Sequence, residues 1–248
     1  NRGIEAWQEQ IINALIDVVK PKGIYDKTYK RSLTEEAAAT RSRLLFGKVP
    51  ETIKVKENGL LFDVDIVEGQ KTGFFLDQRE KRQTLTKYVK NKQVLNCFSY
   101  TGGFSVYALA AGAKHVTSVD VSPKAIELAE KNFVLNDFPK SKYTSICEDV
   151  KKYLREVEPG QFDVVVLDPP AFIKERDKKK EGMVGYKSIN EITMKIMPSD
   201  SILMTCSCSA HLSLDEFKNI LVNASINAGR TIQILEVLTF APDHLELP

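Results

Sequence analysis

Apolar side chains recur every three or four positions along residues 4–19, and Pro21 with Gly23 ends the pattern. This spacing places apolar residues on one face of a helix, so it predicts an amphipathic helix near the start of the chain. Residues 52–57 and 60–67 are two apolar or alternating runs on either side of Asn58-Gly59, a dipeptide typical of a two-residue hairpin. The pattern predicts a small α+β domain over residues 1–88.

From Gln93 onward, apolar runs typical of strands alternate with segments of helical spacing. The predicted strands cover residues 94–98, 116–120, 143–146, 162–167, 202–205 and 232–238. The predicted helices cover residues 104–111, 123–136, 149–157, 186–197 and 214–228. Strands that alternate with helices are typical of a parallel sheet. We therefore predict an α/β fold class, with a Rossmann-like domain over residues 89–248 after the smaller domain.

Composition narrows the class of protein. No apolar run approaches the ~20 residues that span a bilayer, and residues 1–20 lack the basic-then-apolar pattern of a leader, so we expect a cytoplasmic protein. Four unevenly spaced cysteines and three histidines favour reduced thiols and no metal site. The 35 Lys and Arg against 33 Asp and Glu give a net charge of +2, which neither requires nor excludes a nucleic-acid partner.

Glycines and acids follow the predicted strands at the edge where parallel sheets bind ligands. Gly102-Gly103 lies where the first parallel strand turns into a helix, and paired glycines let a ligand approach the backbone. Asp120 ends the second strand and can accept hydrogen bonds from a ribose, because Ser122 can cap the next helix instead. Asp149, after the third strand, can meet an adenine or cap its own helix. Without a G-x-G-x-x-G motif, these features predict a nucleoside ligand without a diphosphate, such as S-adenosylmethionine (SAM).

The fourth strand runs into Asp168-Pro169-Pro170-Ala171-Phe172. The prolines stiffen the backbone, and the face of Phe172 is one on which a base could stack. Enzymes that methylate amino groups carry a similar acidic or amide-Pro-Pro-aromatic segment. This segment predicts a planar nitrogenous substrate without naming the atom that is modified.

The fifth strand runs into Cys206-Ser207-Cys208. Carbon 5 of cytosine becomes nucleophilic only after a group adds to carbon 6, and a thiolate can make that addition. Free cysteines are more often small buried apolar residues, and a Cys-x-Cys pair can also suggest a metal site. No second thiol pair or histidine cluster supports metal, so a nucleophilic thiol is the sharper hypothesis.

Taken together, these segments resemble the RlmI-like 23S ribosomal RNA cytosine-5 methyltransferases. The resemblance covers most of the chain. It rests on residues 69–79 (GQKTGFFLDQR), 96–103 (NCFSYTGG), 168–170 (DPP), 185–190 (GYKSIN), 207–209 (SCS) and 241–244 (APDH).

The resemblance implies roles for individual residues. Cys208 would be the nucleophile, and Asp168 would bind the N3 and amino edge of the cytosine, with Pro169, Pro170 and Phe172 at the substrate. A base for the carbon 5 proton is also required, and the sequence does not identify it. The implied cofactor site comprises Gln78, Arg79, Asn96, Phe98, Ser99, Tyr100, Thr101, Gly102, Gly103, Asp120, Asp149 and Asp168.

The chain departs from this family in three respects. Members commonly begin with an RNA-binding PUA domain, and the pattern of residues 1–88 does not predict one within this sequence. The position after the two prolines is often Lys and is Ala171 here. A last strand after residues 232–238 is expected and is not evident, which affects the sheet edge and any oligomer contacts there. A homodimer is kept as a separate hypothesis for the assembly.

Ribosomal RNA of the large subunit is the implied partner. The cationic segment 174–180, with Lys27, Lys30, Arg31, Arg41 and Arg43, would meet the phosphate backbone and make binding depend steeply on salt. One alternative is methylation of a base nitrogen, such as that of a guanine, with Cys208 only structural. Others are a small-molecule methyltransferase and a SAM-binding module without catalysis.

Overall fold

The computed structural model describes residues 6–27, 43–70, 72–239 and 241. The chain forms two compact units. Unit 1 comprises residues 1–55 and 63–75, and unit 2 comprises residues 56–62 and 76–248. Residues 76–88 are part of unit 2, where helix α3 (Arg79–Leu85) packs against helix α4 (Gly103–Ala110).

Unit 1 contains the predicted amphipathic helix. Helix α2 (Gln8–Val19) ends at Lys20, which has a left-handed backbone and donates its N–H to the Ile16 carbonyl. Strands β1 (Gly23–Asp26) and β2 (Arg43–Gly47) pair antiparallel. The helix prediction is confirmed; Ile4, the first apolar position of its pattern, lies outside the described residues.

The hairpin at Asn58-Gly59 is also confirmed. Strands β3 (Thr52–Glu57) and β4 (Leu60–Asp65) pair with each other, and both turn residues have positive φ, 48° and 88°, as a type I′ turn requires. The second strand ends at Asp65 rather than at residue 67. The Asp65 carboxylate accepts hydrogen bonds from the Val67 and Glu68 N–H groups (3.0 and 2.7 Å), which turns the backbone out of the strand.

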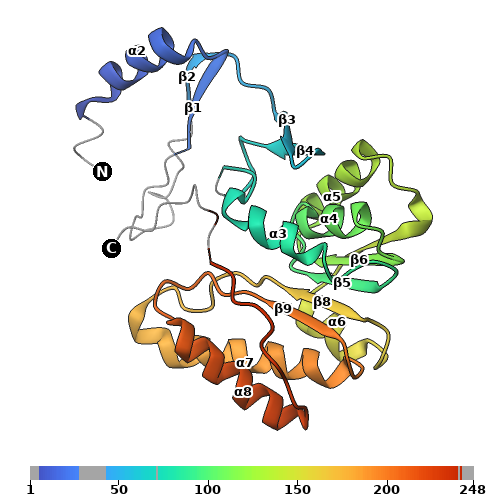
Figure 1. Cartoon of the computed structure of the whole chain (residues 1–248). Helices are drawn as coiled ribbons and strands as arrows, with labels where there is room; N and C mark the ends of the chain where they lie inside the picture. The colour runs from blue at the N-terminus through green and yellow to red at the C-terminus, as the bar shows by residue number, and fades with distance from the viewer. Residues whose placement is uncertain (1–5, 28–42, 71, 240, 242–248) are drawn as a thin grey trace. The chain divides into compact units, whose positions relative to one another are not determined.

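Unit 2 contains a five-stranded parallel sheet in the order β7-β6-β5-β8-β9 (Figure 1). Its strands are β5 (Gln93–Cys97), β6 (His115–Asp120), β7 (Tyr143–Cys147), β8 (Val164–Leu167) and β9 (Ile202–Thr205). Helices α3, α4 and α5 (Pro123–Leu135) cover one face, and α6 (Val150–Glu156), α7 (Lys179–Ile196) and α8 (Leu214–Ala228) cover the other. Single 3-10 turns occur at η2 (Leu76–Gln78), η3 (Lys140–Lys142) and η4 (Arg176–Lys178). The predicted α/β, Rossmann-like fold is confirmed.

The sheet is buried on both faces, as a parallel sheet must be. All four residues of β8 are inaccessible to solvent. One core cluster joins Leu95 of β5 and Val119 of β6 to Leu154 of α6 and Ile189 of α7. None of the helices in the described part of the chain has both the length and the apolar composition of a transmembrane segment.

Two predicted elements differ from the structure. Helix α7 begins at Lys179 rather than at residue 186, because contacts with its neighbours overcome the low helix propensity of Gly182 and Gly185. The predicted strand 232–238 is wrong. This segment makes no strand pairing within the described residues, and Ile234, Leu235 and Val237 are about half exposed. A segment forms a β-strand only where an adjacent strand pairs with its backbone N–H and C=O groups.

A buried ion pair connects the hairpin turn to helices α3 and α4. Arg82 on α3 and Glu57 on β3 are 2% and 6% exposed, and two guanidinium N–H groups donate to the two carboxylate oxygens, each at 2.8 Å. The Tyr107 hydroxyl on α4 donates to Glu57 Oε1 (2.9 Å), and burial, followed by the charge of Glu57, raises the pKa of Tyr107. Gly103 leaves room for Arg82, since a Cβ there would lie 3.3 Å from its Cδ.

We expect Arg82→Met to lower the free energy of unfolding by about 3–5 kcal/mol, because it leaves the Glu57 carboxylate buried without its cation. The double variant Arg82→Met/Glu57→Met should recover most of that loss. Urea unfolding followed by circular dichroism measures both. A double variant no more stable than Arg82→Met alone would contradict the uncompensated Glu57 charge as the cause of the loss.

Gly182 lets α7 approach the loop that follows β8. A Cβ at this position would lie 2.3 Å from Ile173 Cγ1 and 2.8 Å from the Phe172 carbonyl oxygen. At Gly185 the nearest atom, Phe172 Cδ2, would be 3.2 Å away. At Gly182 the added Cβ would meet backbone atoms, whereas at Gly185 it would meet only a ring that can shift.

Gly182→Ala should therefore destabilise the protein by about 1–3 kcal/mol, because overpacking against backbone exceeds the gain of about 1 kcal/mol in helix propensity. Gly185→Ala is the matched control and should change stability by less than about 1 kcal/mol. Thermal unfolding of the two variants gives the comparison. Equal stability of Gly182→Ala and the wild type would contradict the close approach.

Candidate functional site

A tight turn joins β5 to α4 at the carboxyl edge of the sheet. Phe98 (φ 58°), Tyr100 (φ 46°) and Gly102 (φ 77°) all have left-handed backbone conformations. Such conformations at residues with side chains persist only where the surroundings enforce them. The Ser99 N–H donates to the Val119 carbonyl (3.0 Å), and the Gly102 N–H donates to the Ser99 carbonyl (2.9 Å). A Cβ at Gly102 would also lie 3.0 Å from a side chain of α5, so both space and conformation favour glycine.

Asp120 fixes this turn to the end of β6. Its carboxylate accepts hydrogen bonds from the Tyr100 N–H (2.8 Å) and the Ser122 N–H (2.9 Å). Ser122 caps α5, as predicted, by accepting from the Ala125 N–H. Asp120 is therefore not used as the helix cap, although each of its carboxylate oxygens already accepts one backbone N–H. Each oxygen retains a second lone pair with which it can accept a ligand hydroxyl.

Asp149 caps helix α6. Its exposed side chain accepts from the Lys152 N–H (2.9 Å), which is the capping role weighed for it from the sequence. The neighbouring Glu148 pairs with the Lys152 ammonium (2.6 Å), and this hydrogen bond lowers the pKa of Glu148. Asp149 therefore reaches the same sheet edge as Asp120 with one oxygen used in capping.

Two predicted cofactor residues are buried beneath the turn. Asn96 is 1% exposed, and its amide donates to the Ser105 hydroxyl (2.9 Å). Thr101 is 3% exposed, and its carbonyl accepts from the Asn132 amide (2.9 Å). These side chains support the turn from inside and are not brought to the accessible edge.

Gln78 contacts the carboxylate that follows β8. Its buried amide donates to both oxygens of Asp168 at 3.2 Å, and its own Oε1 has no hydrogen-bond partner. The guanidinium of the next residue, Arg79, instead pairs with Glu80 at 3.0 Å and is partly exposed. Gln78 therefore contacts Asp168 directly.

The two candidate thiols have opposite environments. Cys206 is buried, and burial, followed by the charge of Asp168, raises the pKa of its thiol. Cys208 is exposed, and its Sγ lies 3.7 Å from the Pro169 carbonyl oxygen. The Cys206 N–H donates to the Leu167 carbonyl (2.8 Å), which continues the pairing of β8 with β9. The accessible thiol therefore lies beside the Asp-Pro-Pro segment.

Phe172 is packed more closely than a stacking platform would be. Its ring centroid lies 4.7 Å from that of Tyr186 at an interplanar angle of 56°, and the Lys151 ammonium lies 5.6 Å from the ring. Pro169 is buried and Pro170 is exposed. Among the three predicted substrate residues, Pro170 presents the most open surface.

A buried hydrogen bond that no sequence motif predicted lies under the same loops. The hydroxyls of Tyr186 and Ser209 are 2.8 Å apart. Both residues fall within segments that carry the family resemblance, yet neither could be given a role from the sequence. Only the packing of α7 against the loop after β9 brings them together.

The basic residues predicted to meet RNA fall into three groups. Lys30, Arg31 and Arg41 lie outside the described residues. In unit 1, Lys27 donates to the Ile66 and Gly69 carbonyls, and Arg43 donates to the Gln8 side chain. In unit 2, Lys179 pairs with Glu216 (2.7 Å), which lowers the pKa of Glu216 to about 2. The exposed cations of the segment are Lys174, Arg176, Lys178 and Lys180.

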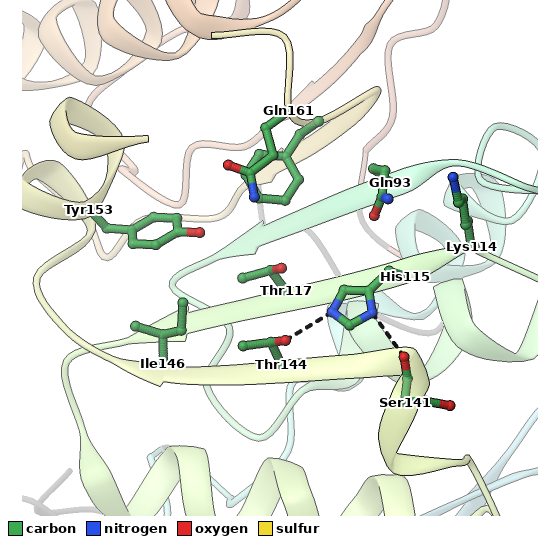
Figure 2. A pocket seen from close by; sticks show the side chains of 10 residues that line it. Gln93, Lys114, His115, Thr117, Ser141, Thr144, Ile146, Tyr153 and Gln161 are labelled. Carbon is green, nitrogen blue, oxygen red and sulfur yellow. Dashed lines mark hydrogen bonds between the residues drawn. The ribbon is translucent and has the colours of Figure 1, made fainter. Parts of the chain in front are cut away.

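A separate pocket lies near the amino ends of the strands, opposite the edge described above. It has a volume of about 510 Å³ and is lined by Gln93, Lys114, Tyr153 and neighbouring residues. Figure 2 shows His115 between the Thr144 hydroxyl (2.9 Å) and the Ser141 carbonyl (3.2 Å). None of the site residues predicted from the sequence lines this pocket.

Comparisons with known proteins identify the family. The family described as S-adenosylmethionine-dependent methyltransferase matches residues 31–235. A relative named ribosomal RNA large subunit methyltransferase I, from Aliivibrio fischeri, is 42% identical over 98% of this chain, and a protein of the same name from Vibrio vulnificus is 41% identical over 98%. The chain spans 62% of the length of each of these relatives.

Solved structures have the same fold. A methyltransferase determined in complex with SAH superposes with a TM-score of 0.80 at 26% identity, covering 97% of this chain and 61% of that one. A SAM-dependent methyltransferase from Streptococcus mutans superposes with a TM-score of 0.73 at 27% identity, covering 89% of this chain and 56% of that one. With the family match over most of its length and the glycine turn, Asp120 and Asp168 at one sheet edge, the chain belongs to the S-adenosylmethionine-dependent methyltransferase family.

Proposed function

We propose that the full-length protein methylates carbon 5 of a cytosine in large-subunit ribosomal RNA, through a covalent adduct with Cys208. The observation that carries this proposal is the exposed Cys208 thiol, 3.7 Å from the Pro169 carbonyl and beside Asp168. The names of the relatives from Aliivibrio fischeri and Vibrio vulnificus support ribosomal RNA as the substrate. Ribosomal RNA of bacteria lies in the cytoplasm, so the proposal places the protein there. A homodimer stays a prediction.

The residues at the carboxyl edge fit SAM. The buried Ser99 hydroxyl, in the turn at residues 98–103, has no hydrogen-bond partner of its own and could take one from a ligand. Asp120 would accept from the ribose hydroxyls with its remaining lone pairs, and Asp149 would accept from the adenine amino group. When bound, SAM would supply a methyl group from its sulfonium, and the demethylated product would be SAH.

The chemistry then requires a nucleophile. The Cys208 thiolate attacks carbon 6 and forms a sulfur–carbon bond, while the carbon 5–carbon 6 electron pair shifts into the ring and N3 gains a proton. Carbon 5, now nucleophilic, takes the methyl group. A base removes the carbon 5 proton, and that electron pair restores the double bond as the sulfur–carbon bond breaks. N3 finally releases its proton, and the thiolate is regenerated.

Asp168 would bind the edge of the cytosine. The Gln78 amide donates to both of its oxygens, which fixes the orientation of the carboxyl group. A carboxylate accepts hydrogen bonds from the cytosine amino group and from a protonated N3. This contact stabilises the protonated ring, which is the better electrophile at carbon 6.

A cytosine stacked within a helix cannot reach Cys208. The substrate is therefore single-stranded at the target, or its base is flipped out at a cost of a few kcal/mol. The exposed cations Lys174, Arg176 and Lys178 lie on the connection that follows Asp168, and Lys180 lies in the first turn of α7. They would contact the phosphates on either side of the target base.

Replacing Cys208 by Ser in the full-length protein should reduce formation of 5-methylcytidine by more than about a thousandfold, because the adduct cannot form. Cys147→Ser is the matched control, since Cys147 is the other exposed cysteine. Labelled methyl from SAM is transferred to protein-free ribosomal RNA, and the product is digested to nucleosides. Label that persists in a methylated purine in Cys208→Ser would support methylation of a base nitrogen instead.

A further inference from the structure

We infer that Ser209 and Tyr186 form a positioning pair that fixes the direction of the Cys208 thiol, an inference that rests on the proposed function. Ser209 is 6% exposed and Tyr186 is fully buried. The Ser209 hydroxyl accepts a hydrogen bond from the Ile173 N–H (3.2 Å) and shares a second with the Tyr186 hydroxyl (2.8 Å). One hydroxyl thus joins helix α7 to both loops of the site.

The chain is held on both sides of Cys208. Two residues earlier, the Cys206 N–H is bonded to the Leu167 carbonyl (2.8 Å). One residue later, Ser209 is bonded to Tyr186 and Ile173. Cys208 itself is exposed between these two buried neighbours. Because the chain is held on both sides of Cys208, rotation about the Cα–Cβ bond is the main motion left to its thiol.

The same pair also holds the loop that carries Asp168. Ile173 lies five positions after Asp168, and its N–H is the group that Ser209 accepts. The Cys208 thiol contacts the Pro169 carbonyl within that loop. Ser209 therefore controls the position of the proposed nucleophile relative to the carboxylate that would bind the base. Correct alignment of such groups contributes strongly to rate.

The hydroxyl of Tyr186 is separable from the packing of its ring. The ring packs against Phe172 (4.7 Å between centroids) and edge-on against Phe217 (5.7 Å). Tyr186→Phe retains both ring contacts and removes only the bond to Ser209. This variant therefore tests the hydrogen bond without opening a cavity in the cluster formed with Ile173 and Ile220.

The test measures kcat and KM for ribosomal RNA together with alkylation of Cys208 by iodoacetamide, read by mass spectrometry, in the full-length protein. Ser209→Ala and Tyr186→Phe should each lower kcat by about ten- to a hundredfold, with KM changed by less than about threefold. Alkylation should stay within about threefold of the wild type, because a small reagent can approach the exposed thiol from many directions. Since both changes remove one shared bond, the double variant should be no slower than Ser209→Ala.

Ser225→Ala is the matched control. Ser225 is 5% exposed on α8, and its hydroxyl donates to the Val222 carbonyl (2.8 Å) without touching either loop. The control should retain the wild-type kcat. A kcat within about threefold of wild type for Tyr186→Phe, or equal losses in Ser225→Ala and Ser209→Ala, overturns the inference. If Ser209→Ala fails to fold, Tyr186→Phe decides alone.

The outcomes separate this inference from the proposed function. If Cys208→Ser still forms 5-methylcytidine, the covalent mechanism fails, whatever the other variants do. If Cys208→Ser is inactive while Ser209→Ala and Tyr186→Phe are as fast as the wild type, only the positioning role fails.

Discussion

Parallel pairing directs the carboxyl end of every strand in the sheet to the same edge, and the whole site depends on this constraint. Cys97 pairs with Leu167, and Leu167 pairs with Thr205, so three strands end in register. The glycine turn, Asp168 and Cys208 follow these ends directly. Groups more than a hundred residues apart in the chain thereby meet without any dedicated scaffold other than backbone hydrogen bonds.

The buried pair of Arg82 and Glu57 adds a second constraint. It fixes α3 against the first turn of α4, where Gly103 leaves space for the guanidinium side chain. Helix α3 begins directly after Gln78, and the amide of Gln78 contacts Asp168. The buried Arg82–Glu57 ion pair thus helps to position Gln78, which in turn orients the Asp168 carboxylate.

Local patterns predicted what local physics determines. The alternation of strands and helices, the turn at Asn58-Gly59 and the cap at Ser122 were all evident from neighbouring residues, and each is confirmed. The contacts of Arg82 with Glu57 and of Tyr186 with Ser209 join residues more than twenty positions apart and leave no periodic signal. Residues 232–238 have a strand-like pattern, but a strand also needs an adjacent strand to pair with. The pattern of one segment does not show whether such a partner is present. Asp120, Asp168 and Cys208 follow strand ends that the sequence pattern indicated, while the partners of Asp120 and the packing of Phe172 could not be foreseen.

The shared hydroxyl of Ser209 also bears on how such a protein can be redesigned. Sequence change in one loop of a Rossmann-like enzyme is usually tolerated because loops are independent modules on a common sheet. Here the two loops and α7 are coupled through one oxygen atom. Grafting only the loop after β8 or only the loop after β9 would leave that oxygen with a mismatched partner. A change of substrate specificity therefore has to replace both loops together with position 186.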